Sequence, residues 1–332
     1  MTTKPLVAGS RPTVSVVMAN FNGAAHVEEA IRSVQAQTIS DFEIIVSDDA
    51  STDRSVNIMA RLQAADGRIR LLRSDRNSGP AAARNRAIEI SKGQWIAIVD
   101  SDDVIHPERL AKLVELAERD NADIVADDLV EFREDISKPV SHLLANTSWT
   151  RPAWVNIVEF VRLNHFYGRG PSLGYLKPLF RGSLVGELGE RYDETLRITE
   201  DFDLVLRLLR AGKRMRVYPL PYYFYRKHPN SISYRLNKEV LKAIRNANLL
   251  ILKEIADRNS PLKVVLKSRI RSIDTAIEYE NLLEALRAKQ WLRSAQIGLI
   301  NPKAAALLRL PFFLRLQRLQ NRLIFGEYLE SS

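Results

Sequence analysis

The fold is decided by one stretch, Trp95-Ile96-Ala97-Ile98-Val99-Asp100-Ser101-Asp102-Asp103, in which an apolar run ends in three acids within four positions. A buried strand that ends in carboxylates places negative charge at the edge of a parallel sheet, where open α/β folds bind their ligands. Mg²⁺ prefers carboxylate oxygens together with substrate phosphates. The stretch therefore predicts a site for a metal and a diphosphate. The alternative is purely structural, because Asp and Ser also form loops and cap helices, and Pro107 follows.

Strands and helices alternate around this stretch. Strands are expected at residues 13–19, 42–47, 69–72 and 123–126. Helices are expected from residue 24 to about 37, after Asp53, from 81 to about 90, and after Pro107. This alternation predicts an α/β fold with a doubly wound, mostly parallel sheet.

The usual glycine-rich phosphate-binding loops are missing from the sequence. Neither G-x-G-x-x-G nor G-x-x-x-x-G-K-[ST] occurs anywhere in the chain. Two of the expected strands instead end in acids, at Asp48-Asp49 and at residues 100–103. Carboxylates acting with a cation are the remaining means of holding a diphosphate.

Four segments, taken in order, closely resemble the signatures of the family 2 inverting glycosyltransferases. They are residues 14–22 (VSVVMANFN), 44–53 (IIVSDDASTD), 77–85 (NSGPAAARN) and 100–103 (DSDD). Four motifs at suitable spacing are far more specific than a lone D-x-D. The resemblance covers about residues 12–130 and implies a GT-A type, nucleotide-diphospho-sugar-binding fold that uses Mn²⁺ or Mg²⁺.

The resemblance also implies roles for single residues on the nucleotide side. Phe21 stands where the family has an aromatic that packs on the base, and Asp49 matches the carboxylate that accepts from the base's imide N–H. Arg84 matches a basic residue near the nucleotide, where a guanidinium gives forked donors to phosphate. The alternatives are a core aromatic for Phe21, a helix cap for Asp49 and an exposed helix arginine for Arg84.

Asp100, Asp102 and Asp103 match the family's acidic motif. The resemblance makes Asp102 the direct metal ligand and places Asp100 nearer the ribose. Residues 222–233 resemble a closing Y-R-x-H-x-x-S-x-S element, in which Arg226 and His228 would face the diphosphate or its metal. For His228 the alternative is an ordinary surface or core histidine.

Asp201 is the candidate catalytic base. The stretch Ile198-Thr-Glu-Asp-Phe-Asp203 precedes an amphipathic helix, and the resembling family places its base aspartate in an E-D pair at this point. An inverting transfer needs such a base on the acceptor hydroxyl. Glu200 and Asp203 compete for the role, and all three acids could merely start the helix, whose dipole favours negative charge there.

Residues 131–196 carry many aromatic side chains but no transferable motif. Trp149, Trp154, Phe160, Phe166 and Tyr167 could form a platform for the acceptor sugar, because aromatic faces pack on sugars. Core aromatics are the alternative explanation. The donor sugar and the linkage cannot be predicted from these loops.

The C-terminal part is basic and helical. Residues 237–332 hold 17 Lys and Arg against 9 Asp and Glu, and two long helices are expected at 238–257 and 262–288. From Pro311 onward, apolar and basic side chains recur at helical spacing, which suits a helix lying on an anionic membrane surface. A cap on the catalytic domain or on another subunit is the alternative. We expect a transferase domain at 12–235, with a nucleotide half at 12–130 and an acceptor half at 131–235, and an extension at 236–332.

The expected activity is transfer of one sugar to a hydroxyl, with glucose from UDP-glucose as the expected donor. The sequence resembles transferases that build bacterial exopolysaccharide, succinoglycan included, on a polyprenyl-diphosphate lipid. The 332 residues include no cysteine, no signal-peptide core and no long apolar run. We therefore expect a cytoplasmic enzyme on the inner face of the membrane, and no nucleic acid partner.

Two other functions compete with this prediction. A sugar-phosphate nucleotidyltransferase also needs carboxylates and Mg²⁺, but it normally has a glycine-rich loop near the first strand. A non-catalytic binding protein for membrane or nucleic acid would explain the basic C-terminal part but not the four motifs.

Overall fold

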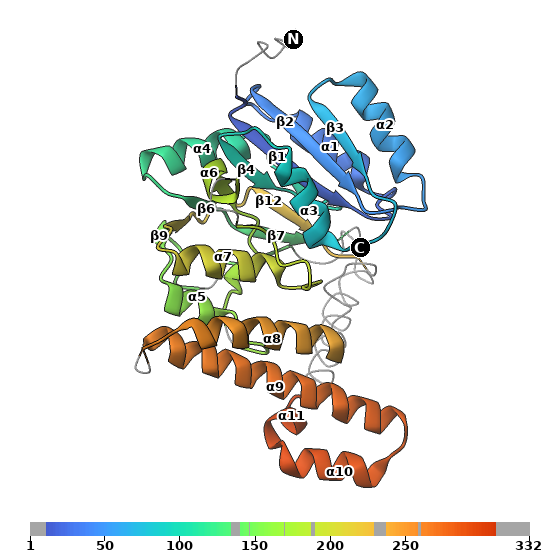
Figure 1. Ribbon diagram of the computed structural model, residues 1–332, viewed down its shortest axis with the longest axis vertical. Helices are drawn as coiled ribbons and strands as arrows, with labels where there is room; N and C mark the ends of the chain where they lie inside the picture. Colours follow the sequence, from blue (N-terminus) through green and yellow to red (C-terminus); the bar gives the residue numbers. More distant parts are fainter. Residues whose placement is uncertain are drawn as a thin grey trace, which may run out of the picture.

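The computed structural model of the chain describes residues 11–133, 140–145, 147–168, 170–186, 190–228, 237–257 and 260–309. An α/β domain occupies one end of the molecule, and helices extend from its lower side in Figure 1. The predicted segment from Pro311 onward lies outside the described residues.

The first half of the chain forms a parallel sheet flanked by helices. Its elements are β1 (Val14–Asn20), α1 (Val27–Gln35), β2 (Phe42–Asp48), α2 (Ser55–Ala65), β3 (Ile69–Arg73), α3 (Pro80–Glu89) and β4 (Trp95–Ile98). The strands lie in the order β3-β2-β1-β4, and every neighbouring pair is parallel. The carboxyl ends of β1, β2 and β4 therefore meet at one edge, as predicted.

Helix α1 shows why the predicted boundaries shift by a few residues. Val27, Ala30, Ile31 and Val34 form the expected buried stripe. The helix begins at Val27 and not at residue 24, because the backbone of His26, with φ −129°, is not helical and its N–H closes a turn on the carbonyl of Gly23.

The sheet continues with shorter strands from the second half of the chain. These elements are α4 (Arg109–Arg119), β6 (Ile124–Ala126), β9 (Ala153–Trp154), α5 (Ile157–Leu163), the 3₁₀ turn η1 (Leu173–Tyr175), β10 (Leu179–Arg181), α6 (Gly182–Gly186), α7 (Glu200–Arg210) and β11 (Met215–Val217). β6 agrees with the strand predicted at 123–126. β10, which was not predicted, lies antiparallel between β4 and β6, and β9 pairs antiparallel with β11. The eight-stranded sheet is thus mostly parallel with antiparallel additions.

A second, four-stranded sheet was not predicted. It contains β5 (Val104–Ile105), β12 (Tyr223–Arg226), β7 (Leu129–Phe132) and β8 (Ser141–His142) in the order β5-β12-β7-β8. Tyr223 pairs with Ile105, and Phe224 with Val104. This pairing brings residues 222–228 beside the acidic stretch at the end of β4.

The C-terminal part is helical, as predicted. It contains α8 (Lys238–Glu254), α9 (Pro261–Arg287), α10 (Trp291–Ile300) and α11 (Pro302–Ala306). α8 and α9 run antiparallel, since Lys238 pairs with Glu284 and Arg245 with Asp274. α9 packs on α5, which in turn packs on α7 (Figure 1). Among the described helices, none has the length and apolar character needed to cross a bilayer.

Candidate active site

Asp103 anchors the acidic stretch to β12. Asp100, Asp102 and Asp103 follow β4, and one ligand oxygen from each lies within 4.8 Å of the others. Asp103 is fully buried, and its carboxylate accepts hydrogen bonds from the Tyr223 hydroxyl at 2.7 Å and the Arg226 backbone N–H at 2.8 Å. Burial, with the charges of Asp102 and Asp100, raises the pKa of Asp103 well above its usual value. Asp103 therefore supports the cluster from inside the protein.

Asp102 is the carboxylate of this cluster with the most exposed side chain, at 32%. Its Oδ2 lies 2.9 Å from Nε2 of His228. Mg²⁺ bonds are about 2.1 Å long in octahedral geometry, so two adjacent ligand atoms lie about 3 Å apart. The contact is a hydrogen bond, and the same spacing suits two adjacent ligands of a divalent cation. Arg226 holds this corner in place, since its Nε donates to the Asp102 carbonyl at 2.9 Å and its Nη2 lies 2.6 Å from Glu29.

Asp100 faces two buried cations. Its Oδ1 lies 2.7 Å from Nη2 of Arg84, and its Oδ2 lies 2.9 Å from Nζ of Lys177. Burial alone would raise the pKa of Asp100, but the charges of Lys177 and Arg84 outweigh it and hold this pKa well below its usual value. Asp100 is thus kept ionised at the carboxyl end of β4.

Arg84 is buried and not an exposed helix arginine. From α3 its Nη1 reaches Oε1 of Glu200 at 2.5 Å, while its Nη2 holds Asp100. Its side chain is 4% exposed. Although burial lowers the pKa of Arg84, the surrounding carboxylates, Asp201, Asp100 and Glu200, raise it well above its usual value. Arg84 therefore joins the end of β4 to the start of α7.

Asp201 lies between two cations, with Lys177 at one carboxylate oxygen and Arg84, whose Nη1 is 3.7 Å away, at the other. Its Oδ2 lies 2.8 Å from Nζ of Lys177, and its buried Oδ1 has no hydrogen-bond partner among the described residues. The two competing acids are both engaged. Glu200 is bound by Arg84, and Asp203 pairs with Arg207 at 2.9 Å, one turn along the helix. Asp201 is therefore the acid of this turn that connects through Lys177 to Asp100 at the end of β4.

Asp49 shapes the loop before α3. Its Oδ2 accepts from the backbone N–H groups of Ser78 at 3.0 Å and Gly79 at 2.6 Å, and its Oδ1 accepts from Arg86 at 2.9 Å. Asp49 thus orients the entry to α3, but it is the N-cap residue of neither α2 nor α3. The predicted hydrogen bond between Asp49 and the nucleotide base stays a prediction.

The aromatic residues divide between surface and core. Phe21, at the carboxyl end of β1, is 46% exposed, which excludes the core alternative and leaves its ring free to pack on a base. Trp149 and Phe160 are buried in the hydrophobic core. They cannot form the platform considered for the acceptor. Trp154 lies under the guanidinium of Arg214, 4.0 Å from the ring centroid.

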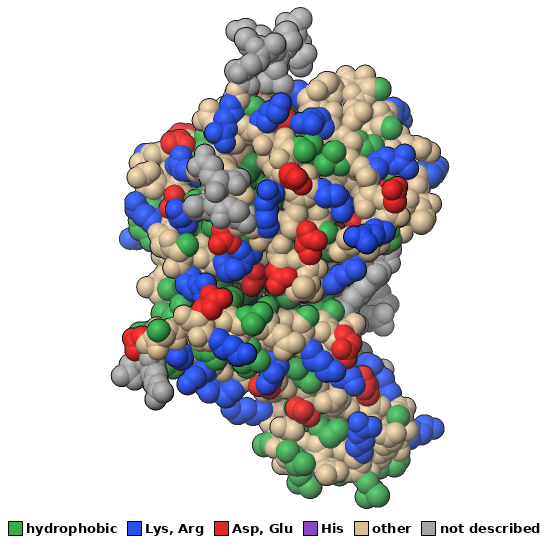
Figure 2. Space-filling model, in the orientation of Figure 1, with side chains coloured by type: hydrophobic (Ala, Val, Ile, Leu, Met, Phe, Trp, Pro, Cys, Tyr) green, Lys and Arg blue, Asp and Glu red, His purple; other side chains and the backbone are tan. Residues whose placement is uncertain are grey.

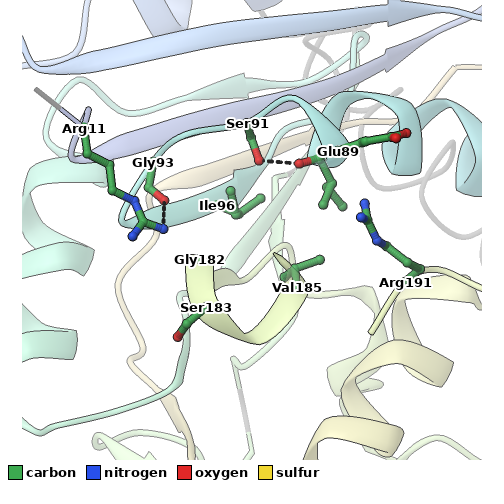
Figure 3. Close-up of a pocket in the computed structure, with 10 residues that line it drawn as sticks. Arg11, Glu89, Ser91, Gly93, Ile96, Gly182, Ser183, Val185 and Arg191 are labelled. Carbon is green, nitrogen blue, oxygen red and sulfur yellow. Dashed lines mark hydrogen bonds between the residues drawn. The ribbon is translucent and has the colours of Figure 1, made fainter. Parts of the chain in front are cut away.

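A separate cavity of about 270 Å³ lies at the other end of β4. Arg11, Gly93, Ile96, Gly182 and Arg191 are among its lining residues (Figure 3). One Arg11 nitrogen donates to the Gly93 carbonyl at 3.3 Å. None of the predicted site residues lines this cavity, so it takes no part in the acidic site.

A protein-family model that matches half of the chain identifies the family. The model described as Glycosyl transferase family 2 matches residues 15–180, which include β1, the acidic stretch and Lys177. The chain belongs to glycosyl transferase family 2. The resemblance found in the four motifs is confirmed.

Curated relatives extend the similarity over nearly the whole chain. Succinoglycan biosynthesis protein ExoO of Rhizobium meliloti is 31% identical over 313 residues, covering 94% of this chain and 88% of that protein. Succinoglycan biosynthesis protein ExoU of the same organism is 29% identical, covering 90% and 86%. The similarity to ExoO and ExoU therefore reaches the C-terminal helices of this family 2 transferase.

Solved structures support the fold. The crystal structure of S. aureus TarS 1–349 in complex with UDP has a TM-score of 0.59 and 18% identity, covering 96% of this chain and 92% of that one. The complex of the same protein with UDP-GlcNAc also has a TM-score of 0.59, at 17% identity. The family 2 chain therefore shares its fold with TarS.

Lys177 is a central site residue that the sequence did not predict. It directly precedes Pro178 and β10, and only 8% of it is exposed. Burial lowers the pKa of this lysine, but the charges of Asp100 and Asp201 raise it well above its usual value. The one signal in the sequence is a single lysine between apolar neighbours, Leu176 and Leu179. That pattern does not reveal two acids that lie 77 residues before and 24 residues after the lysine.

Proposed function

We propose that this family 2 transferase moves one sugar, with inversion, from a nucleoside diphosphate to a hydroxyl of a polyprenyl-diphosphate-linked glycan. The observation that carries the proposal is that Asp102 and Asp201 belong to one site, connected through Asp100 and Lys177. Asp102 offers a partly exposed carboxylate beside His228, and Asp201 offers an oxygen that accepts no hydrogen bond among the described residues. Lys177 bridges the two sides through Asp100 and Asp201.

Asp201 acts as the general base. Its Oδ1 takes the proton of the acceptor hydroxyl while the hydroxyl oxygen forms a bond to the anomeric carbon of the donor sugar. The bond between that carbon and the diphosphate oxygen breaks, and the nucleoside diphosphate leaves with the electron pair. Attack from the opposite face inverts the centre, so an α-linked donor gives a β-glycoside.

Asp102 and His228 would hold Mn²⁺ or Mg²⁺. The cation supplies positive charge where negative charge builds up on the leaving diphosphate. Hard oxygen ligands of this kind suit Mg²⁺, and an imidazole nitrogen also suits Mn²⁺. Arg226, held against Asp102 and Glu29, keeps this side of the site in position.

The donor is a UDP-sugar, with UDP-glucose as our expectation. TarS, which shares the fold, was crystallised with UDP and with UDP-GlcNAc. Phe21 supports this proposal because its exposed ring can stack on a base, and Asp49 lies at the end of the neighbouring strand β2. Arg84 keeps Asp100 in place for the ribose.

The acceptor belongs to bacterial exopolysaccharide synthesis. Two relatives are named for the biosynthesis of succinoglycan, and both align over most of their length. The basic C-terminal part supports work at the inner face of the cytoplasmic membrane, where a lipid-linked acceptor is found. The proposal accordingly includes a peripheral contact with an anionic membrane.

Asp201→Asn tests the assignment of the base. We expect release of UDP from UDP-glucose to fall by about 10²–10⁴-fold, because a positioned general base contributes that much. UDP affinity, measured by isothermal titration, should change less than about threefold. Asp203→Asn is the matched control, since Asp203 lies in the same helical turn but pairs with Arg207, and it should retain UDP release.

Two outcomes would contradict the proposal. Full UDP release by Asp201→Asn would remove Asp201 from the mechanism. Release of pyrophosphate from UTP and glucose 1-phosphate, with no UDP release from UDP-glucose, would instead favour the nucleotidyltransferase alternative.

A further inference from the structure

Helix α10 turns its apolar face away from the protein. The exposed fractions are 66% for Trp291, 91% for Leu292, 83% for Leu299 and 67% for Ile300. Figure 2 shows hydrophobic side chains gathered at this end of the molecule, over α10. A helix that served only to cover a core would bury these residues.

Helical geometry places the four residues on one side of α10. At 100° per residue, Trp291, Leu292, Leu299 and Ile300 fall within about half of the helix circumference. Ala295 and Gln296 share this arc and are also exposed. The opposite side carries Ser294, which is buried against the rest of the protein. We call the exposed arc, Trp291, Leu292, Ala295, Gln296, Leu299 and Ile300, the α10 face.

Basic residues surround the α10 face. Four exposed cations lie on α10, on α11 or on the turns next to them: Lys289, Arg293, Lys303 and Arg309. Glu284 is the last acid before this part of the chain, and the next in the sequence is Glu327. An apolar face with a rim of one positive sign is the pattern of a helix that lies in the interface of an anionic bilayer.

We propose that the α10 face docks on an anionic lipid bilayer. A second copy of this chain is a poorer occupant, because two α10 faces brought together would bring eight cations together, and residues 285–309 hold no acid to offset them. An anionic lipid surface complements the same charge. Trp291 suits this position, since tryptophan prefers the boundary between headgroups and acyl chains.

α9 links the docking face to the catalytic domain. Arg269, near the middle of α9, packs on Phe202 beside Asp201. The 18 residues from Arg269 to Arg287 span about 27 Å of helix at 1.5 Å per residue. When α10 lies on the bilayer, α9 therefore holds the acidic site away from the membrane surface by a distance of this order. A glycan that extends from a membrane lipid can carry the acceptor hydroxyl over this distance to the site.

The docking proposal deepens the proposed function, on which its lipid-linked acceptor rests. Vesicle binding needs neither donor nor acceptor, so its failure leaves sugar transfer untouched, and a failure of sugar transfer leaves vesicle binding untouched.

Flotation of the full chain with vesicles tests the docking. We expect binding to vesicles of phosphatidylglycerol and phosphatidylcholine, and weak binding to phosphatidylcholine alone. Each cation near the surface should contribute about fivefold at low salt. The double variant Leu292→Gln/Leu299→Gln should lower vesicle partitioning by about tenfold or more, because it removes apolar surface from the contact.

The matched control is Leu250→Gln/Val264→Gln. These two side chains are also exposed, at 60% and 58%, and lie near the other end of the α8–α9 hairpin. The control should bind vesicles as the unmodified chain does. Trp291 provides a second readout, since its fluorescence should shift to the blue with anionic vesicles and this shift should disappear in Trp291→Phe.

Three results would overturn the docking proposal. Vesicle binding that survives Leu292→Gln/Leu299→Gln would place the membrane contact elsewhere in the chain, residues 310–332 included. Absence of binding to anionic vesicles by the folded chain would remove the membrane as the occupant. Self-association that the α10 variant abolishes, without vesicle binding, would identify a second copy as the occupant.

Discussion

Lys177 connects the two halves of the site through a single ammonium group. Its Nζ lies 2.9 Å from Asp100 and 2.8 Å from Asp201, and all three side chains are largely buried. Asp100 belongs to the nucleotide half and Asp201 is the proposed base. We infer that Lys177 positions Asp201 relative to the donor. Lys177 itself contacts no reacting atom in the proposed mechanism.

Lys177→Met should destabilise the protein and impair transfer. It leaves two buried carboxylates without the cation between them, which costs about 3–5 kcal/mol of unfolding free energy at pH 7. Lys177→Arg keeps a cation and should restore part of the UDP release. Lys112→Met is a control, because the exposed Lys112–Glu115 pair contributes less than about 1 kcal/mol.

The pH dependence separates charge from packing in this prediction. In the unmodified chain the pKa of Asp100 is lowered, so its ionised form stabilises the fold above the unfolded pKa of about 3.9, and this contribution is lost as pH falls below that value. Without Lys177 the pKa of Asp100 rises. The stability deficit of Lys177→Met should therefore narrow as pH falls below about 4 in urea unfolding. A deficit that does not change with pH would mean that Lys177 acts through packing alone.

Single residues were predictable where a local motif carries them. The sequence motifs selected Asp102, His228 and Asp201, and the structure brings all three to the same edge of the sheet. Lys177 and Glu29 were not predicted, because their partners lie far away in the sequence and neither residue stands in a recognised pattern. When the partner of a charged residue is distant in the sequence, the residues next to it in the chain show no pattern that reveals the pair.

At the scale of elements, Arg269 joins three helices beneath the site. Its guanidinium lies 3.7 Å from the Phe202 ring centroid on α7, and its Nε donates to Asn248 of α8 at 3.1 Å. It is 1% exposed, and burial lowers its pKa to about 9. This contact fixes the C-terminal helices to the helix that carries Asp201.

Arg269→Ala should cost about 2–4 kcal/mol of unfolding free energy, because it opens a cavity and leaves the Asn248 side-chain oxygen unpaired. UDP release should fall as well, since Phe202 is adjacent to Asp201. Arg271→Ala is the control: Arg271 lies on the same helix but is exposed, and its loss should change stability by less than about 0.5 kcal/mol. Equal effects of the two substitutions in urea unfolding would contradict the account.

Long elements were predictable from the sequence, and short ones were not. β1, β2 and the helices α1, α8 and α9 have apolar residues at regular spacing over seven or more positions. β10 has three residues, and β5 and β8 have two each, which is too short for any periodicity to show. Their partners are also distant: β12 pairs in parallel with β7, more than 90 residues earlier.

At the scale of the whole molecule, the chain places its chemistry and its proposed membrane contact in different parts. The acidic site lies at the carboxyl edge of the sheet, and α10 lies at the far end of the C-terminal helices (Figure 1). The overall charge pattern was visible in the sequence, where acids gather before residue 130 and cations after 237. The side of α10 that faces solvent could not be predicted, because the exposure of its side chains depends on how α9 and α11 pack around it.

Isothermal titration with UDP and GDP, each with and without Mn²⁺, tests the central claim most directly. We expect the folded chain to bind UDP in a Mn²⁺-dependent manner, and Asp102→Ala to lose most of that dependence because it removes the exposed carboxylate beside His228. UDP binding that is unaffected by both Mn²⁺ and Asp102→Ala, or no binding of either nucleotide, would contradict the assignment of this acidic cluster as the donor site.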